Sequence, residues 1–158
     1  MKSYYLAYGS NLNKEQMALR CPGAVALGVA EIQDYEPVFR RGYLTIEPKE
    51  GSSVLVGIWE ISKANEKALD HYEGFPKFYY KEWFQTEIPG IGKRLCMAYI
   101  MTGGHPFQEP SSYYLNTVWQ GYKDFGLDFA DFQPVMSARM YAIDHAPWKT
   151  EVKEDGKA

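Results

Sequence analysis

The sequence predicts an α+β domain built on a mixed, mostly antiparallel small β-barrel flanked by short helices. Segments with strand composition outnumber helical ones, and hairpin spacing between them is more frequent than the longer spacing of βαβ units. Glycines within two of these segments, Gly28 and Gly57, would allow a sheet to bend and close. Composition fits an open, curved sheet as well as a closed barrel.

Strands are expected where aliphatic, β-branched and aromatic residues run together with little charge. Residues 47–52 are rich in turn formers and indicate a hairpin, and Pro89-Gly90 indicates another. The expected strands are residues 4–7, 25–32, 43–46, 54–59, 78–88 and 95–102.

Three short helices are expected between the strands. Asn13 can cap the first, with Gln16 at the spacing of a capping box, and Ser62 can cap the second. Proline and glycine follow the first two segments, where a helix cannot continue. The expected helices are residues 14–20, residues 63–72, and a third that starts at Ser111 or Ser112, runs to about Phe125 and closes at Gly126.

The length and the charge of the chain argue against several classes of protein. The chain has 158 residues, which fits one domain over residues 1–148 followed by a charged tail, residues 149–158, expected to be disordered. The net charge of −3 and the lack of a basic stripe argue against a nucleic-acid partner. Neither a membrane span nor a leader peptide is expected, so the expected compartment is the cytoplasm, with Cys21 and Cys96 as buried thiols.

Metal and nucleophile signatures are missing from the sequence. His71, His105 and His145 lie far apart, without the spacing of a metal site, so no metal is expected. Ser10 follows a strand and a glycine, but the second glycine of a nucleophile elbow is replaced by Leu12. A serine nucleophile is therefore not favoured.

The first strand leads into a small polar loop, Tyr8-Gly9-Ser10-Asn11-Leu12. A strand followed by a glycine turn and a helix start leaves unpaired backbone N–H groups, which bind anions. The loop lacks the repeated glycines and the lysine of a phosphate-binding loop. From spacing alone, an ordinary strand-to-helix turn remains the simpler interpretation.

Glu73 stands apart from the other acidic residues. It ends the second expected helix and is followed by Gly74 and Phe75, with more aromatic residues shortly after. The negative end of the helix dipole and an apolar environment would both raise its pKa, as a general acid or base near neutral pH requires. An exposed glutamate without a role is an equally good interpretation at this point.

Taken in order along the chain, these segments resemble the γ-glutamylcyclotransferase family, including its AIG2-like relatives. The resemblance covers residues 4 to roughly 130. It rests on five segments: residues 7–12 after the first strand, Gln33-Asp34-Tyr35, Gly57-Ile58-Trp59, Leu69-Asp70 with Glu73-Gly74, and residues 110–115 before a helix that reaches Gly121, with Gly126-Leu127 beyond.

The resemblance implies a six- or seven-stranded barrel with one cavity at its mouth and a reaction without a cofactor. The small-molecule substrate would be a γ-glutamyl amide, whose own α-amine attacks its γ-carbonyl to give 5-oxoproline and a free amine or amino acid. The loop of Tyr8, Gly9, Ser10, Asn11 and Leu12 would hold the substrate's α-carboxylate and carbonyl.

The resemblance also assigns roles to single residues. Glu73 would move the proton and Tyr114 would hydrogen-bond the substrate, while Phe75, Tyr79 and Tyr114 are candidates for the cavity wall. The glutathione-specific branch has leucine where this chain has Asn11, which makes that branch a poorer match.

Several alternatives stay open at this point. Arg40 and Arg41 could bind a second carboxylate but are more simply read as solvated. A non-catalytic binding module, and hydrolysis or transfer on a related amide, are the other functions to weigh. The leaving group and the oligomeric state do not follow from the sequence.

Overall fold

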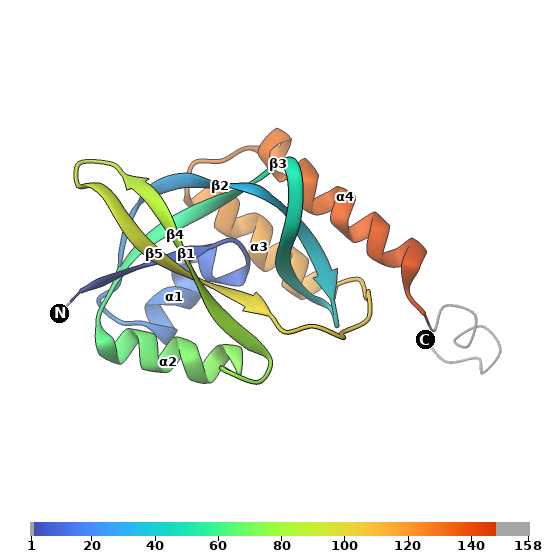
Figure 1. Ribbon diagram of the computed structural model, residues 1–158, viewed down its shortest axis with the longest axis horizontal. Helices are drawn as coiled ribbons and strands as arrows, with labels where there is room; N and C mark the ends of the chain where they lie inside the picture. The colour runs from blue at the N-terminus through green and yellow to red at the C-terminus, as the bar shows by residue number, and fades with distance from the viewer. Residues whose placement is uncertain (1, 148–158) are drawn as a thin grey trace.

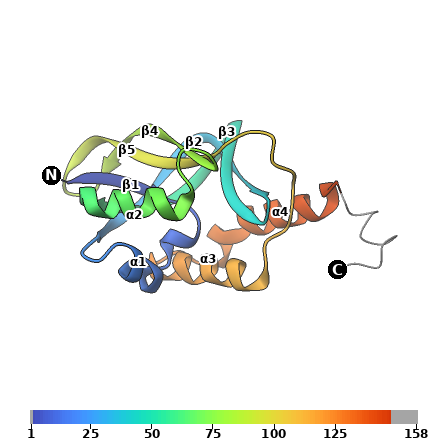
Figure 2. The same cartoon turned by 90° about the horizontal axis from the view of Figure 1, so that it is seen from below.

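A five-stranded mixed sheet forms the centre of the described part of the chain, residues 2–147 of the computed structural model. Its strand order is β2-β3-β1-β5-β4, and helices cover the sheet (Figures 1 and 2). The strands are β1 Ser3–Ala7, β2 Val25–Arg40, β3 Tyr43–Ile61, β4 Tyr79–Ile88 and β5 Gly92–Met101. The helices are the 3-10 turn η1 Ser10–Leu12, α1 Lys14–Arg20, α2 Lys63–Glu73, α3 Ser112–Asp124 and α4 Phe129–His145.

The short strand β1 occupies the middle of the sheet. It runs antiparallel to β3, with Tyr5 opposite Trp59, and parallel to β5, with Tyr5 opposite Met97. Tyr5, Leu6 and Ala7 are all buried, because elements cover both faces of the central strand. The chain that leaves β1 therefore enters the interior of the molecule, at the start of η1.

The α+β class is confirmed, but the sheet is open, so the word barrel describes it only loosely. Strands β2 and β4 are its two edges. The edges approach each other, and Tyr35 on β2 meets Phe84 on β4 with ring centroids 5.4 Å apart. Within residues 2–147 no backbone ladder joins them. Side-chain packing rather than hydrogen bonding thus brings the curled sheet toward closure.

The long β2–β3 hairpin explains why the structure has fewer strands than expected. Its turn is Arg41-Gly42, both with positive φ (54° and 82°), which is the conformation of the tight turns that match strand twist. The expected hairpin turn at residues 47–52 is wrong. That segment lies inside β3, where the register shifts around Asp34, and the Asp34 carboxylate accepts the Gly51 N–H at 2.9 Å. The register shift and the Asp34 hydrogen bond therefore allow the strand to continue through residues that usually form turns.

The three expected helices are present with the expected caps. Asn13 accepts the Gln16 N–H, Ser62 forms a capping box with Asn65, and Ser111 caps α3. Both cysteines are free and buried, as expected. Among the described residues, none of the helices has both the length and the apolar character to cross a membrane. The expected tail, residues 149–158, lies outside the described residues.

Helix α4 was not predicted from the sequence. It starts with a capping box between Asp128 and Asp131 and lies along the outer part of the β2–β3 hairpin (Figure 1). Buried positions such as Phe132, Val135, Ala138 and Ala142 are interspersed with exposed apolar residues, so the amphipathic pattern is weak. The helix is recognised only through its contacts with β2.

Close packing around Leu12 gives a stability prediction. A Cβ added to Gly121 on α3 would lie 2.6 Å from Leu12 Cβ and 2.7 Å from the Asn13 backbone nitrogen, both of which are held in place. Gly121→Ala should therefore lower the free energy of unfolding by about 1–3 kcal/mol, as overpacking does. Urea denaturation measures this change. The matched control is Gly103→Ala, where nothing lies within 4 Å of the added atom, and equal stability of the two variants would contradict the prediction.

Candidate active site

One cavity lies where the chain leaving β1 meets the end of α2. Its volume is about 270 Å³. Aromatic side chains dominate the lining, together with the polar residues of the loop and a single carboxylate. The lining residues are Tyr5, Tyr8, Gly9, Ser10, Asn11, Tyr43, Leu44, Tyr72, Glu73, Phe78, Tyr79, Tyr99 and Tyr114.

The site loop, residues 8–12, contains the 3-10 turn η1, and its residues 8–11 line this cavity. The Leu12 N–H donates to Gly9 O and the Asn13 N–H donates to Ser10 O, both at 3.0 Å, which closes η1. The N–H groups of Ser10 and Asn11 precede these bonds, and the first N–H groups of a helical turn have no partner within that turn. Trp59 Nε1 donates to Asn11 O at 2.9 Å and fixes the loop from β3. The geometry fits a site for a carboxylate or a carbonyl oxygen.

The side chain of Asn11 connects the loop to the acid. Its Nδ2 donates to Tyr5 Oη at 2.8 Å and to Glu73 Oε2 at 3.2 Å. Its Oδ1 accepts a hydrogen bond from Arg20 Nη1 at 2.7 Å. Asn11 is almost completely buried, so these bonds replace those that its amide would make to water.

Glu73 is the only carboxylic acid among the described residues that line the cavity. It is the last residue of α2, and Gly74 ends the helix in the left-handed conformation with φ 67°. Burial raises the pKa of the Glu73 carboxyl to about 7, and the positive charge of Arg20 opposes part of this rise. A carboxyl group with this pKa changes protonation state near neutral pH, which is suited to general acid–base catalysis.

Tyrosine hydroxyls surround the carboxyl group and are themselves held in place. Tyr8 donates to Tyr99 O, Tyr79 donates to Leu44 O at 2.9 Å, and Tyr114 accepts the Leu44 N–H at 3.2 Å. Burial raises the pKa of Tyr8, Tyr79 and Tyr114 above the usual tyrosine value. These groups therefore stay neutral when Glu73 titrates.

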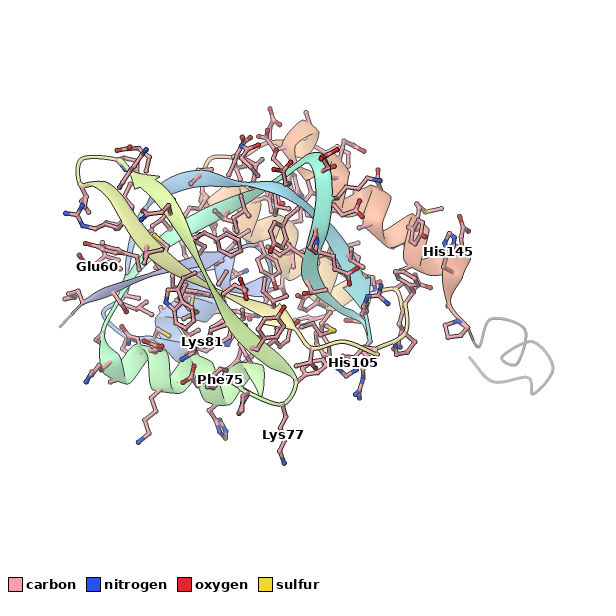
Figure 3. All side chains as sticks on the ribbon, in the orientation of Figure 1. Glu60, Phe75, Lys77, Lys81, His105 and His145 are labelled. Atoms are coloured by element: carbon pink, nitrogen blue, oxygen red, sulfur yellow. The ribbon has the colours of Figure 1, made fainter. Side chains whose placement is uncertain are left out.

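A network of charged side chains holds the hydroxyl group of Tyr99, one of the residues that line the cavity. Tyr99 donates to Asp70 Oδ1 at 2.6 Å, and Lys81 Nζ bridges Asp70 at 2.9 Å and Glu66 at 2.6 Å. Figure 3 shows Lys81 and Phe75 beside α2, and Lys81 Nζ lies 4.3 Å from the Phe75 ring centroid. Phe75 is about one-third exposed and is not part of the lining, whereas the other expected wall residues, Tyr79 and Tyr114, are.

The structure brings most of the expected site residues together. Tyr8, Gly9, Ser10, Asn11, Glu73 and Tyr114 all line the one cavity. Leu12, the last residue of the loop, does not, because its side chain is fully buried in the hydrophobic core.

The two arginines of the β2–β3 turn differ from each other. Arg40 forms an ion pair with Glu47 at 2.6 Å and donates to His105 O at 2.8 Å, so it is occupied. Arg41 is exposed, with its guanidinium 5.5 Å from the ring centroid of Phe78. Neither arginine lines the cavity.

Sequence reasoning missed several residues of the site. Tyr5 lies within β1, where its residue type indicates only a strand, so no local signal shows that it lines the cavity. No local pattern singles out Arg20, which comes nine positions after Asn11 and reaches it from the end of α1.

The histidines and Ser10 do not form a metal site or a nucleophile site within residues 2–147. Within residues 2–147 no group of three or more His, Cys, Asp or Glu residues is arranged to hold a metal ion. His105 and His145 are separate in Figure 3, and His71 is exposed on α2. The Ser10 hydroxyl is hydrogen-bonded to the Tyr72 hydroxyl at 3.1 Å, rather than to a histidine or a carboxylate that could activate it.

A buried acid with a raised pKa beside a polar loop in one cavity fits an enzyme that carries out acid–base chemistry on a small polar substrate. The family model described as gamma-glutamyl cyclotransferase, AIG2-like, matches residues 5–120. The chain therefore belongs to the γ-glutamylcyclotransferase family.

Individual relatives agree with this assignment. The chain is similar to gamma-glutamylcyclotransferase from Bos taurus (31% identical, covering 96% of this chain and 84% of that protein) and from Mus musculus (33%, with the same coverage). A solved structure of a gamma-glutamyl cyclotransferase superposes with a TM-score of 0.73 at 27% identity, covering 85% of this chain and 86% of that one.

Proposed function

We propose that this enzyme converts a γ-glutamyl amino acid or γ-glutamyl amine to 5-oxoproline and the free amino acid or amine, with Glu73 as general acid and base. The observation that carries the proposal is the 3.2 Å hydrogen bond from Asn11 Nδ2 to Glu73 Oε2, which joins the anion-binding loop and the acid in one cavity. The substrate class is inferred from the names of the relatives, and the role of the acid is inferred from the residues that line the cavity.

The charges of the cavity favour one orientation of the substrate. Its α-ammonium group is expected to pair with the Glu73 carboxylate, which is the only charged side chain among the described residues that line the cavity. Its α-carboxylate and γ-carbonyl oxygen then accept hydrogen bonds from the Ser10 and Asn11 N–H groups and from tyrosine hydroxyls such as that of Tyr114. Neutral donors preset in this way stabilise negative charge without the need to reorganise.

The reaction proceeds with proton transfers through Glu73. The carboxylate takes a proton from the α-ammonium, and the freed amine attacks the γ-carbonyl carbon to form a new C–N bond. The tetrahedral oxyanion is held by the loop. The bond to the leaving nitrogen then breaks as Glu73 returns the proton to that nitrogen. The ring nitrogen gives its second proton to the Glu73 carboxylate, which passes it to the released amine, so 5-oxoproline and a protonated amine are the products. Because the attack is intramolecular, a folded substrate conformation supplies much of the rate, and no redox step calls for a cofactor.

The alternative of a non-catalytic binding module is not favoured. The relatives that match most of this chain are named gamma-glutamylcyclotransferase, and pure binding needs no group that changes protonation state near neutral pH, whereas burial raises the pKa of Glu73 to about 7. The same feature is useful for moving a proton. The cytoplasmic location expected from the sequence stays a prediction, consistent with the buried free thiols of Cys21 and Cys96.

A panel of γ-glutamyl amino acids and γ-glutamyl amines, assayed for 5-oxoproline by mass spectrometry, tests the function and ranks the leaving groups. Turnover of at least one class is expected. Ligands that bind, shown by calorimetry, without formation of 5-oxoproline would support the binding module instead.

The pKa of Glu73 predicts an acidic limb in the pH–rate profile. The substrate ammonium can lose its proton only to the ionised carboxylate. As the pH falls below the Glu73 pKa of about 7, a growing fraction of the carboxyl group is protonated, so kcat/KM should fall roughly tenfold for each pH unit. Initial rates from about pH 5 to about pH 9 measure this limb, which lies well above the ordinary glutamate value of about 4.3. A profile that stays flat down to about pH 5 would remove the argument for a buried, proton-carrying Glu73.

A further inference from the structure

Arg20 reaches into the site from the end of α1 without lining the cavity. Its Nη1 donates to Asn11 Oδ1 at 2.7 Å, and its Nη2 donates to the Gln16 side-chain oxygen. Its guanidinium also lies over the Tyr72 ring, with Cζ 3.7 Å from the ring centroid. These three contacts fix the group in one orientation.

We propose that Arg20 is a positioning residue that holds the Asn11 amide with its nitrogen turned toward Glu73. A guanidinium group only donates hydrogen bonds, so the Asn11 oxygen must face Arg20. The two N–H bonds of Asn11 Nδ2 are then directed at Tyr5 Oη and Glu73 Oε2. The inference rests on the proposed function, since it concerns the same acid.

The stacking contact extends this role to a second residue of the loop. The Tyr72 hydroxyl is hydrogen-bonded to Ser10 Oγ at 3.1 Å, and Tyr72 directly precedes Glu73 on α2. Arg20 therefore contacts the loop through Asn11 and the end of α2 through Tyr72. It joins two segments that are about sixty residues apart in the sequence and must keep a fixed separation for proton transfer.

Within residues 2–147, Arg20 is also the cation whose charge lowers the pKa of the acid. The groups that face Glu73 from the surrounding elements are tyrosines: Tyr5 and Tyr8 on and after β1, Tyr79 on β4, Tyr99 on β5 and Tyr114 on α3. Burial raises the pKa of each of them, so they stay neutral. A hydrogen bond donated by Asn11 favours the ionised carboxylate, and so does the charge of Arg20.

Two variants separate orientation from charge. Arg20→Met removes both the planar donor and the charge, while Arg20→Lys keeps the charge but loses the stacked, forked geometry. The matched control is Lys67→Met, which removes a cation from the exposed face of α2. The first readout is the Glu73 titration followed by 13C NMR of the carboxyl carbon, which needs no substrate. The second is kcat at about pH 9, where the carboxylate is ionised in all variants.

The proposal predicts that Arg20→Met moves the Glu73 midpoint to higher pH, while Arg20→Lys and Lys67→Met leave it near that of the unaltered enzyme. Both Arg20 variants should lose about 10- to 100-fold in kcat, as small misplacements of reacting groups do. In the Asn11→Ala background, Arg20→Met should cause a smaller loss than in the unaltered enzyme, because the route through Asn11 is already gone and only the contact with Tyr72 remains.

Three results would overturn the proposal: an unshifted Glu73 midpoint in Arg20→Met, an unchanged kcat in both Arg20 variants, or losses from Arg20→Met and Asn11→Ala that multiply. If Arg20→Met does not fold, the kcat of Arg20→Lys decides alone. Failure of the proposed function looks different, since the unaltered enzyme would then yield no 5-oxoproline, while the NMR titration would still report on Arg20.

Discussion

Glu73→Gln is expected to lower kcat for 5-oxoproline formation by about 10²- to 10⁴-fold with little change in substrate binding. The glutamine amide has nearly the same shape and can still accept the hydrogen bond from Asn11 Nδ2. It cannot take a proton from the substrate ammonium, so the amine remains unreactive. Single-turnover kinetics measure the chemical step, and calorimetry with a γ-glutamyl ligand measures binding.

The matched control for this variant is Glu87→Gln, which changes an exposed carboxylate on β4 far from the cavity lining. It should retain the rate of the unaltered enzyme. A rate for Glu73→Gln equal to that of the unaltered enzyme would show that another group moves the proton.

Asn11→Asp should cause the second-largest loss, about 10²- to 10³-fold in kcat/KM at neutral pH. The substitution replaces the amide nitrogen that lies 3.2 Å from Glu73 Oε2 with a second acidic oxygen. Two carboxyl groups this close share a proton, so the pair retains it to a higher pH and Glu73 is unavailable as a base. The acidic limb of the pH–rate profile should move to higher pH accordingly.

Asn116→Asp serves as the matched control, because Asn116 is exposed on α3 and its substitution adds the same charge outside the cavity. If Asn11→Asp and Asn116→Asp gave the same profile as the unaltered enzyme, the contact between Asn11 and Glu73 would have no part in catalysis.

Local signals predicted most of the secondary structure. Caps at Asn13, Ser62 and Ser111 identified three helices, because a cap is a property of a few adjacent residues. The β2–β3 hairpin was harder. Residues 47–52 contain turn formers, yet the true turn is Arg41-Gly42, and a register shift beside Asp34 accommodates the segment inside β3. Such shifts depend on the partner strand, which the sequence of one strand does not specify.

In the site, too, local features could be predicted from the sequence, whereas features that depend on the packing of distant segments could not. Glycine and short polar residues after a strand indicated the loop, and a helix end followed by aromatic residues indicated Glu73. Their meeting in one cavity depends on β1 lying centrally in the sheet with α2 packed near it. Arg20 could not be predicted, because its role arises only from the distance to Asn11 in the folded chain.

The most direct test of intramolecular aminolysis is to follow turnover of a γ-glutamyl substrate in 18O-labelled water and identify the product by mass spectrometry. Attack by the substrate's own amine forms 5-oxoproline without taking oxygen from the solvent, so an unlabelled lactam is the predicted product. Glutamate that carries one 18O atom would instead show that water attacks the γ-carbonyl, and would contradict the role assigned here to Glu73 and the loop of residues 8–12.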